Sequence, residues 1–137
     1  MADSNPNTFP LSAESLQASL TVNDLEQSLA WYRDALGFEV DREHRRDDRL
    51  FAVSLRAGTV RMLLTQDNGA RGTDRVKGAG FSLQITTSQN IDAIAARVAQ
   101  TGTQFETEPT DAMGVRMFRV RDPNGFLFVI SSPRPGS

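Results

Sequence analysis

One structural pattern occurs twice in this chain of 137 residues. Residues 19–24 and 82–87 are each followed by an amphipathic run, a glycine and three short apolar runs. The two glycines, Gly37 and Gly102, lie 65 positions apart. A repeat of this length predicts two small units that each have one open apolar face. Because neither unit can bury that face alone, we expect the two to pack together around a shared cavity.

The composition is that of an ordinary globular domain, with 39% hydrophobic and 23% charged residues and a net charge of −2. This balance offers no basic surface for nucleic acid or for an anionic membrane, so we expect neither partner. No apolar run approaches the roughly 20 residues that cross a bilayer. The absence of cysteine excludes disulfides and thiolate metal sites, and it fits a cytoplasmic location.

The first unit is predicted to begin with a strand and a helix. Residues 16–22 alternate apolar and polar side chains, the pattern of a half-buried strand. Asp24 is a good N-cap, and Gly37 supplies the left-handed position that ends a helix. Between them, apolar residues recur on one helical face: Leu25, Leu29, Tyr32 and Leu36.

Three strands complete the first unit, at residues 38–40, 50–55 and 60–65. Ala57 and Gly58 fit a tight turn between the last two. The polar run 42–49 is predicted to be a hairpin loop.

The second unit repeats this order. A strand over 81–86 precedes a helix that Ser88 or Asn90 caps and Gly102 ends. A short strand at Phe105, one over 115–120 and one over 126–131 follow, with a turn at Asp122-Pro123-Asn124-Gly125 between the last two.

The sequence therefore predicts an α+β fold built from two strand-helix-strand-strand-strand modules. The expected boundaries are a flexible arm at 1–15, a single domain at 16–132 and a flexible tail at 133–137. Within the domain we expect module one at 16–65, a linker at 66–80 and module two at 81–132.

Residues 22–38 resemble the opening helix signature of the vicinal oxygen chelate superfamily, and residues 121–126 resemble its closing hairpin. This superfamily includes glyoxalase I, the bleomycin resistance proteins, the fosfomycin resistance proteins and the extradiol dioxygenases. The resemblance covers about residues 16–132 and is closest in character to the metal-free, bleomycin-resistance-like members. It implies paired βαβββ modules that form a curved open sheet around a cleft, in a homodimer.

The metal-using enzymes of this superfamily take His and Glu ligands from the first and last strands of each module. The matching positions here are Gln17, Phe81, Val129 and either Leu63 or, one register off, Met62. Three of these four positions have no ligating atom, and a glutamine amide is a poor ligand for zinc, nickel or iron. We therefore expect no bound metal and no other cofactor.

His44 is the single histidine of the chain, so two histidines and a carboxylate cannot ligate one metal within a subunit. Glu43 and Asp47 lie in the same predicted loop and Asp41 directly precedes it, and any of these carboxylates could orient and charge the imidazole as an acid–base group. Loop histidines are mostly uninvolved in chemistry, and we assign His44 no catalytic role.

Several side chains are candidates for binding a ligand in the cleft. Gln17 either points outward or offers an amide that hydrogen-bonds the ligand. Phe81 could stack on a planar ligand, and Trp31 could either do the same or pack in the core or in a dimer contact. Arg116 and Arg119 differ by three positions, so at most one of them faces the cleft, where it could bind a carboxylate. Arg61 also lies in a predicted strand and faces either outward or into the cleft. Met113 and Met117 are either pocket-lining or core residues. The predicted ligand-binding set is Gln17, Trp31, Leu63, Phe81, Arg116, Met117, Arg119 and Val129.

The favoured hypothesis is a metal-free protein that sequesters a small organic molecule, such as an antibiotic or an aromatic metabolite, in an apolar cleft. The alternative is a glyoxalase-like lyase or isomerase that acts without the usual metal, through His44 or through Glu106, Glu108 or Asp111. A third interpretation is a regulatory or structural module within an assembly.

Overall fold

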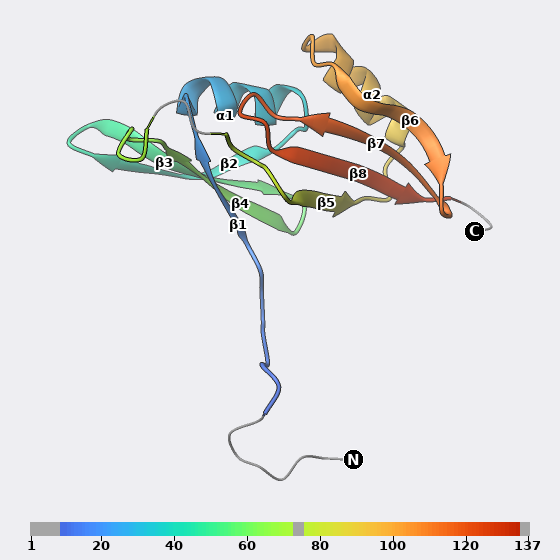
Figure 1. Ribbon diagram of the computed structural model, residues 1–137, viewed down its shortest axis with the longest axis horizontal. Coiled ribbons are helices and arrows are strands. Elements are labelled where there is room, and N and C mark those ends of the chain that lie inside the picture. The colour runs from blue at the N-terminus through green and yellow to red at the C-terminus, as the bar shows by residue number, and fades with distance from the viewer. Residues whose placement is uncertain (1–8, 73–75, 135–137) are drawn as a thin grey trace.

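The structure, a computed structural model, describes residues 9–72 and 76–134 and contains two βαβββ modules (Figure 1). Module one comprises β1 (Ala18–Val22), α1 (Leu25–Asp34), β2 (Glu39–Arg46), β3 (Arg49–Ala57) and β4 (Val60–Gln66). Module two comprises β5 (Ser82–Thr86), α2 (Ile91–Gln100), β6 (Phe105–Ala112), β7 (Val115–Arg121) and β8 (Leu127–Pro133). The predicted α+β fold of paired modules is confirmed.

Each module has its own four-stranded sheet, in the order β1-β4-β3-β2 for sheet one and β5-β8-β7-β6 for sheet two. The first and last strands of each module pair in parallel, and all other pairs are antiparallel. Figure 1 shows the sheets side by side, with both helices above them. The duplication seen in the sequence is therefore a duplication of topology.

The helix ends follow from local side-chain chemistry. The Asp24 carboxylate accepts the backbone N–H of Gln27 at 3.1 Å, and the Asn90 amide oxygen accepts that of Ala93 at 2.9 Å. Asn90, rather than Ser88, is thus the cap of α2. Gly37 adopts a φ of +78° after α1, a left-handed backbone that favours glycine.

The predicted hairpin loop over residues 42–49 is wrong. Strands β2 and β3 run through this segment and are joined by only two residues, Asp47 and Asp48, with φ of 53° and 62°. Two consecutive left-handed residues form the kind of turn that matches the twist of a hairpin, and aspartate tolerates this region better than most residues. The polar sequence arises because β2 is the edge strand of sheet one, where charged side chains are exposed.

The helices cover one face of each sheet, and the core lies between helices and sheets. Strand residues that point toward the helices are buried: Leu20, Val22, Val53, Leu55, Met62, Leu64, Phe118, Val120, Phe128 and Ile130. Alternate residues of the same strands point the other way. We call that opposite surface of each sheet its helix-free face.

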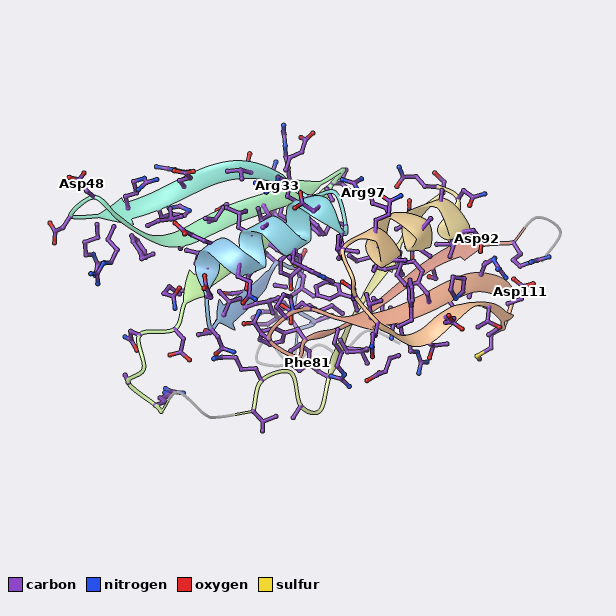
Figure 2. The ribbon with its side chains drawn as sticks, turned by 90° about the horizontal axis from the view of Figure 1, so that it is seen from above. Arg33, Asp48, Phe81, Asp92, Arg97 and Asp111 are labelled. Atoms are coloured by element: carbon purple, nitrogen blue, oxygen red, sulfur yellow. The ribbon has the colours of Figure 1, made fainter. Side chains whose placement is uncertain are left out.

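Side chains from α1 join the two modules. The Tyr32 hydroxyl donates to Asp122 Oδ2 at 2.6 Å, and Trp31 Nε1 donates to Thr103 Oγ1 at 2.8 Å. From α2, Arg97 donates to the backbone carbonyls of Arg33 and Asp34 at 3.0 and 3.1 Å, across the junction visible in Figure 2. These contacts fix the orientation of one sheet relative to the other.

The predicted arm at 1–15 and tail at 133–137 lie partly outside the described residues. Residues 9–17 form no helix or strand and are exposed, so β1 begins at Ala18 rather than at residue 16. Of the predicted linker, residues 73–75 lie outside the described part. On either side of them, Lys77 and Asp67 form an ion pair of 2.7 Å whose side chains are 6% and 9% exposed. Neither α1 nor α2 is long and apolar enough to cross a membrane.

Candidate ligand-binding face

Leu63 lies at the centre of the helix-free face of sheet one. In the strand register, Leu63 on β4 stands opposite Ser19 on β1 and Ser54 on β3. Its neighbours in β4, Met62 and Leu64, point into the core, whereas Leu63 is only half-buried. Leu63, one of the four positions that the family resemblance assigns to metal ligands, therefore presents an apolar side chain between two hydroxyls.

Val129 occupies the equivalent place on sheet two. It stands opposite Gln84 on β5 and Arg119 on β7, and it is also half-buried. Register and topology make Ser19-Leu63-Ser54 and Gln84-Val129-Arg119 equivalent rows of the two modules. Each row centres on an aliphatic side chain and is flanked by polar groups, but the second row also brings a positive charge.

His44 also belongs to the helix-free face of sheet one, contrary to its predicted position in a loop. It lies in β2, where its Nε2 is 3.0 Å from Ser54 Oγ, and Ser54 is the register partner of Leu63. Its ring centroid lies 6.3 Å from that of Phe51. Sequence reasoning missed this placement because β2 has no apolar alternation. The signal that could have found it is the Asp-Asp turn, which sets the register of the hairpin.

The other two superfamily positions lie at the margins of these faces. Gln17 is exposed just before β1. Phe81 is 48% exposed just before β5, and its ring centroid lies 6.0 Å from that of Phe126, in a cavity of about 310 Å³ between β1 and Lys77. Gln84 on β5 is equivalent to Ser19 on β1, so the residue equivalent to Gln17 is Ser82 and not the predicted Phe81. The offset of 65 positions between Gly37 and Gly102 gives the same pairing.

Trp31 is half-buried on α1, away from the helix-free faces. Its indole packs edge-on against Tyr32 at 5.0 Å between centroids and reaches Phe128 of module two at 6.5 Å. With its hydrogen bond to Thr103, it contributes to the packing between the modules, which was the alternative interpretation of this residue.

Arg116 and Arg119 lie on opposite faces of β7. Arg116 points to the helix side and forms hydrogen bonds to Asp92 of α2 at 2.8 and 2.9 Å and to Asp111 of β6 at 3.0 Å. Hydrogen bonds from Arg116 hold the pKa of Asp92 and of Asp111 below the ordinary value, and they raise the pKa of Arg116 itself. Arg116 is therefore a structural residue of module two.

Arg119, by contrast, is exposed on the helix-free face and forms no ion pair within the described residues. Met117 shares that face and is 8% exposed, opposite Ser131, whereas Met113 is fully exposed in a turn. On sheet one, Arg61 is paired with Asp41 at 2.7 Å. Arg119 is thus the arginine of the predicted set that is available to a bound anion.

The residues that the family resemblance places at metal positions do not fit a metal ion. Leu63 and Val129 have no donor atom, and neither Gln17 nor Ser82 is a strong ligand for a transition metal. Within residues 9–72 and 76–134, no three His, Asp or Glu side chains gather in a group that could hold a metal. What the two rows offer instead is apolar surface with hydroxyl, amide, imidazole and guanidinium groups around it, the usual lining of a site for an organic molecule.

Comparison with known proteins agrees with this architecture. No curated protein matches the chain significantly in sequence. Among solved structures, TnmS3, an antibiotic binding protein from Streptomyces sp. CB03234, has a TM-score of 0.70 at 17% identity and covers 92% of this chain and 100% of its own. TioX from Micromonospora sp. ML1 has a TM-score of 0.69 at 18% identity, with 89% and 100% covered.

A glyoxalase I variant from Zea mays has a TM-score of 0.70 at 21% identity and covers 86% of this chain but 46% of its own. At these identities the likeness is one of fold. A family model, in contrast, matches the sequence directly over residues 15–130, nearly the whole of both modules. The chain belongs to the Glyoxalase/Bleomycin resistance protein/Dioxygenase superfamily.

Proposed function

We propose that this protein binds a small organic molecule, an antibiotic or an aromatic metabolite, on the helix-free faces of its sheets and without a metal ion. The observation that carries the proposal is the equivalence of Leu63 and Val129. Both stand where the family resemblance expects a metal ligand, both are half-buried on the helix-free face, and both present aliphatic carbon.

The physical basis is the burial of apolar surface. Covering Leu63 and Val129 with a flat apolar ligand removes their exposed carbon from water, which contributes about 25 cal/mol per Å². The hydroxyls of Ser19 and Ser54, the Gln84 amide and the Arg119 guanidinium surround these centres and give a ligand its orientation.

A structural neighbour supports the same class of function. TnmS3 shares the fold over 92% of this chain and is an antibiotic binding protein. As the family resemblance implies, we also propose a homodimer, which sedimentation of the purified protein tests. The cytoplasmic location expected from the sequence stays a prediction.

The test is a thermal-shift screen of aromatic antibiotics and metabolites followed by substitution of the two centres. A ligand at about 100 times its Kd stabilises the folded protein by about 2.7 kcal/mol. We expect Leu63→Lys and Val129→Lys to abolish the shift. Val40→Lys is the matched control, since Val40 is exposed on β2 and outside both rows. A ligand whose shift survives both centre substitutions would contradict the proposed site.

Metal independence has its own test. We expect the hit from this screen to bind equally well after dialysis against a chelator. Stoichiometric zinc, nickel, iron or manganese in protein purified without chelator, together with loss of binding on its removal, would contradict the metal-free proposal.

A lyase or isomerase that acts without the usual metal is the second candidate, and the 3.0 Å contact between His44 and Ser54 favours it. An imidazole in contact with a hydroxyl beside Leu63 is suited to moving a proton to or from a bound substrate. If a screen of aldehyde adducts and other isomerisable carbonyl compounds reveals turnover, we expect His44→Ala to remove it and Ser54→Ala to reduce it. Turnover that is unchanged in His44→Ala would exclude this role.

A further inference from the structure

A second cavity, of about 560 Å³, lies at the end of sheet one where the β2–β3 hairpin meets the end of β4. Its lining includes two arginines, Arg46 and Arg49, together with Phe51, Thr65 and Asn68. None of these residues belongs to the rows centred on Leu63 and Val129. The hairpin turn that closes this end contains Asp48, which Figure 2 shows at one extremity of the molecule.

The two arginines are direct cross-strand partners. Arg46 on β2 and Arg49 on β3 are paired in the antiparallel register, so their side chains leave the sheet on the same face. Like charges directly opposite each other in an antiparallel pair are destabilising. An anion between the two guanidinium groups removes that repulsion.

Two neighbouring arginines of the same hairpin differ from these two in having carboxylate partners. Arg45 pairs with Glu43 at 3.0 Å and Arg56 with Glu39 at 3.4 Å. Within residues 9–72 and 76–134, Arg46 and Arg49 form no ion pair, although Asp47 lines the same cavity. Two guanidinium groups and one carboxylate leave a net positive charge at the cavity.

Stacking orients one of these guanidinium groups. The central carbon of the Arg46 guanidinium lies 5.1 Å from the centroid of the Phe51 ring, within the range of a cation–π contact. A planar guanidinium held in this way loses less conformational freedom when it binds a carboxylate or phosphate through two parallel hydrogen bonds.

Neutral donors complete the cavity. The Asn68 amide oxygen accepts the backbone N–H of Ala70 at 2.9 Å, which leaves the amide nitrogen of Asn68 as a donor. Thr65, whose side chain carries a hydroxyl, also lines the cavity. Gln66 contributes less, because its amide is committed to Leu25 N at 2.9 Å and to the carbonyl of Asn23 at 2.8 Å.

We propose that this cavity is an oxyanion-binding site, which takes the carboxylate or phosphate group of a small molecule between Arg46 and Arg49. Thr65 and Asn68 donate further hydrogen bonds to the same group. The site goes beyond the ligand-binding function proposed above, and it stands whether or not a ligand binds at Leu63 and Val129.

The test is an NMR titration of the full chain, at low ionic strength, with four probes. Benzoate and phenyl phosphate present the two oxyanions on an organic molecule, inorganic phosphate presents the free ion, and benzyl alcohol is the uncharged control. We expect the three anions, and not benzyl alcohol, to shift the backbone amides of residues 46–51 and 65–68. Tighter binding of the organic anions than of inorganic phosphate identifies an organic ligand, and the reverse identifies free phosphate.

Substitutions locate the binding. Arg46→Gln and Arg49→Gln should each weaken it about tenfold or more, because each removes charge-assisted hydrogen bonds. Arg42→Gln is the matched control, since Arg42 is an exposed arginine of the same strand without an ion pair in the described part of the chain. Thermal unfolding of each variant verifies that the fold is retained, as expected at exposed positions. Equal weakening in Arg42→Gln and Arg49→Gln, shifts confined to other residues, or no shift with any anion would overturn the proposal.

Discussion

The Tyr32 hydroxyl of module one donates a 2.6 Å hydrogen bond to Asp122 Oδ2 of module two, in a place where both side chains are almost wholly buried. The other carboxylate oxygen of Asp122 accepts the backbone N–H groups of Asn124, Gly125 and Phe126 at 2.8 to 2.9 Å. One carboxylate thus closes the β7–β8 turn and attaches α1 to it. Since the two candidate faces belong to different modules, their relative position depends on this bond together with the contacts of Trp31 and Arg97.

We expect Tyr32→Phe to lower the free energy of unfolding by about 1–2 kcal/mol, because a buried carboxylate loses one donor. Asp122→Ala should cost about 3 kcal/mol or more, since it leaves several buried donors without an acceptor. The measurement is urea unfolding followed by the fluorescence of Trp31, the single tryptophan. Asp41→Ala, which breaks an exposed ion pair with Arg61, is the control and should cost less than about 1 kcal/mol.

Alkaline titration gives a second test of the same contact. Burial, with a further contribution from Asp122, raises the pKa of Tyr32 far above its ordinary value. Because the pKa in the folded state is raised, the associated stability is present below about pH 10 and is lost as pH rises above that value. Tyr32 is the only tyrosine, so tyrosinate absorbance should appear only together with unfolding. Tyrosinate that forms near pH 10 while Trp31 fluorescence stays native would refute this expectation.

The acid side of the stability profile should depend on Arg116. Its hydrogen bonds lower the pKa of Asp92 and Asp111 in the folded state. Their stabilisation is therefore present above the ordinary carboxyl pKa of about 3.9 and is lost as pH falls through the lower folded values. We expect Arg116→Gln to reduce the fall in Tm between about pH 5 and pH 2. Arg119→Gln, on the opposite face of the same strand, should leave that fall unchanged.

Adjacent leucines on β4 should separate binding from stability. Leu64 is fully buried, and we expect Leu64→Ala to lower the free energy of unfolding by about 2–5 kcal/mol. Leu63 is half-buried on the helix-free face, so Leu63→Ala should cost less than half of that while weakening the binding of an aromatic ligand. Urea unfolding and thermal-shift titration of both variants check this. Equal losses of stability would show that Leu63 is a core residue.

Two glycines before β5 provide a test of close packing. Gly78 has a φ of +80°, and a Cβ there would lie 2.5 Å from the carbonyl oxygen of Gly125. Gly80 has a φ of +86° but open space around it. Gly80→Ala should therefore cost about 1–2 kcal/mol from backbone strain alone, and Gly78→Ala should cost clearly more because two backbone segments must separate. Thermal unfolding of the two variants measures the difference, and equal costs would argue against tight contact at Gly78.

The predictions that succeeded rest on local chemistry. Asp24 and Asn90 cap helices because their side chains accept backbone donors three residues ahead. Gly102 directly follows the C-cap of α2 in a left-handed conformation, as predicted, whereas Gly37 is left-handed two residues after Ala35, the C-cap of α1. The strands predicted over 115–120 and 126–131 correspond to β7 and β8 within a few residues.

The predictions that failed concern polar segments. Edge strand β2 carries charged residues on both faces, so its sequence has the composition of a loop. This hid the placement of His44 beside Ser54.

The spacing of Arg116 and Arg119 indicated opposite faces but could not say which face meets α2. That choice depends on the contact between Arg116 and Asp92, which are 24 residues apart.

The sequence by itself determined the duplicated topology, the N-terminal caps of both helices and the absence of ligating side-chain atoms at Leu63 and Val129, because each depends on residue type and short-range spacing. Only the tertiary structure decided which side chains share a face: His44 with Ser54 and Leu63, and Arg46 with Arg49 at the far end of the sheet. The physical reason is that strand register and the packing of one module on the other are set by many long-range contacts together. No single local pattern specifies them.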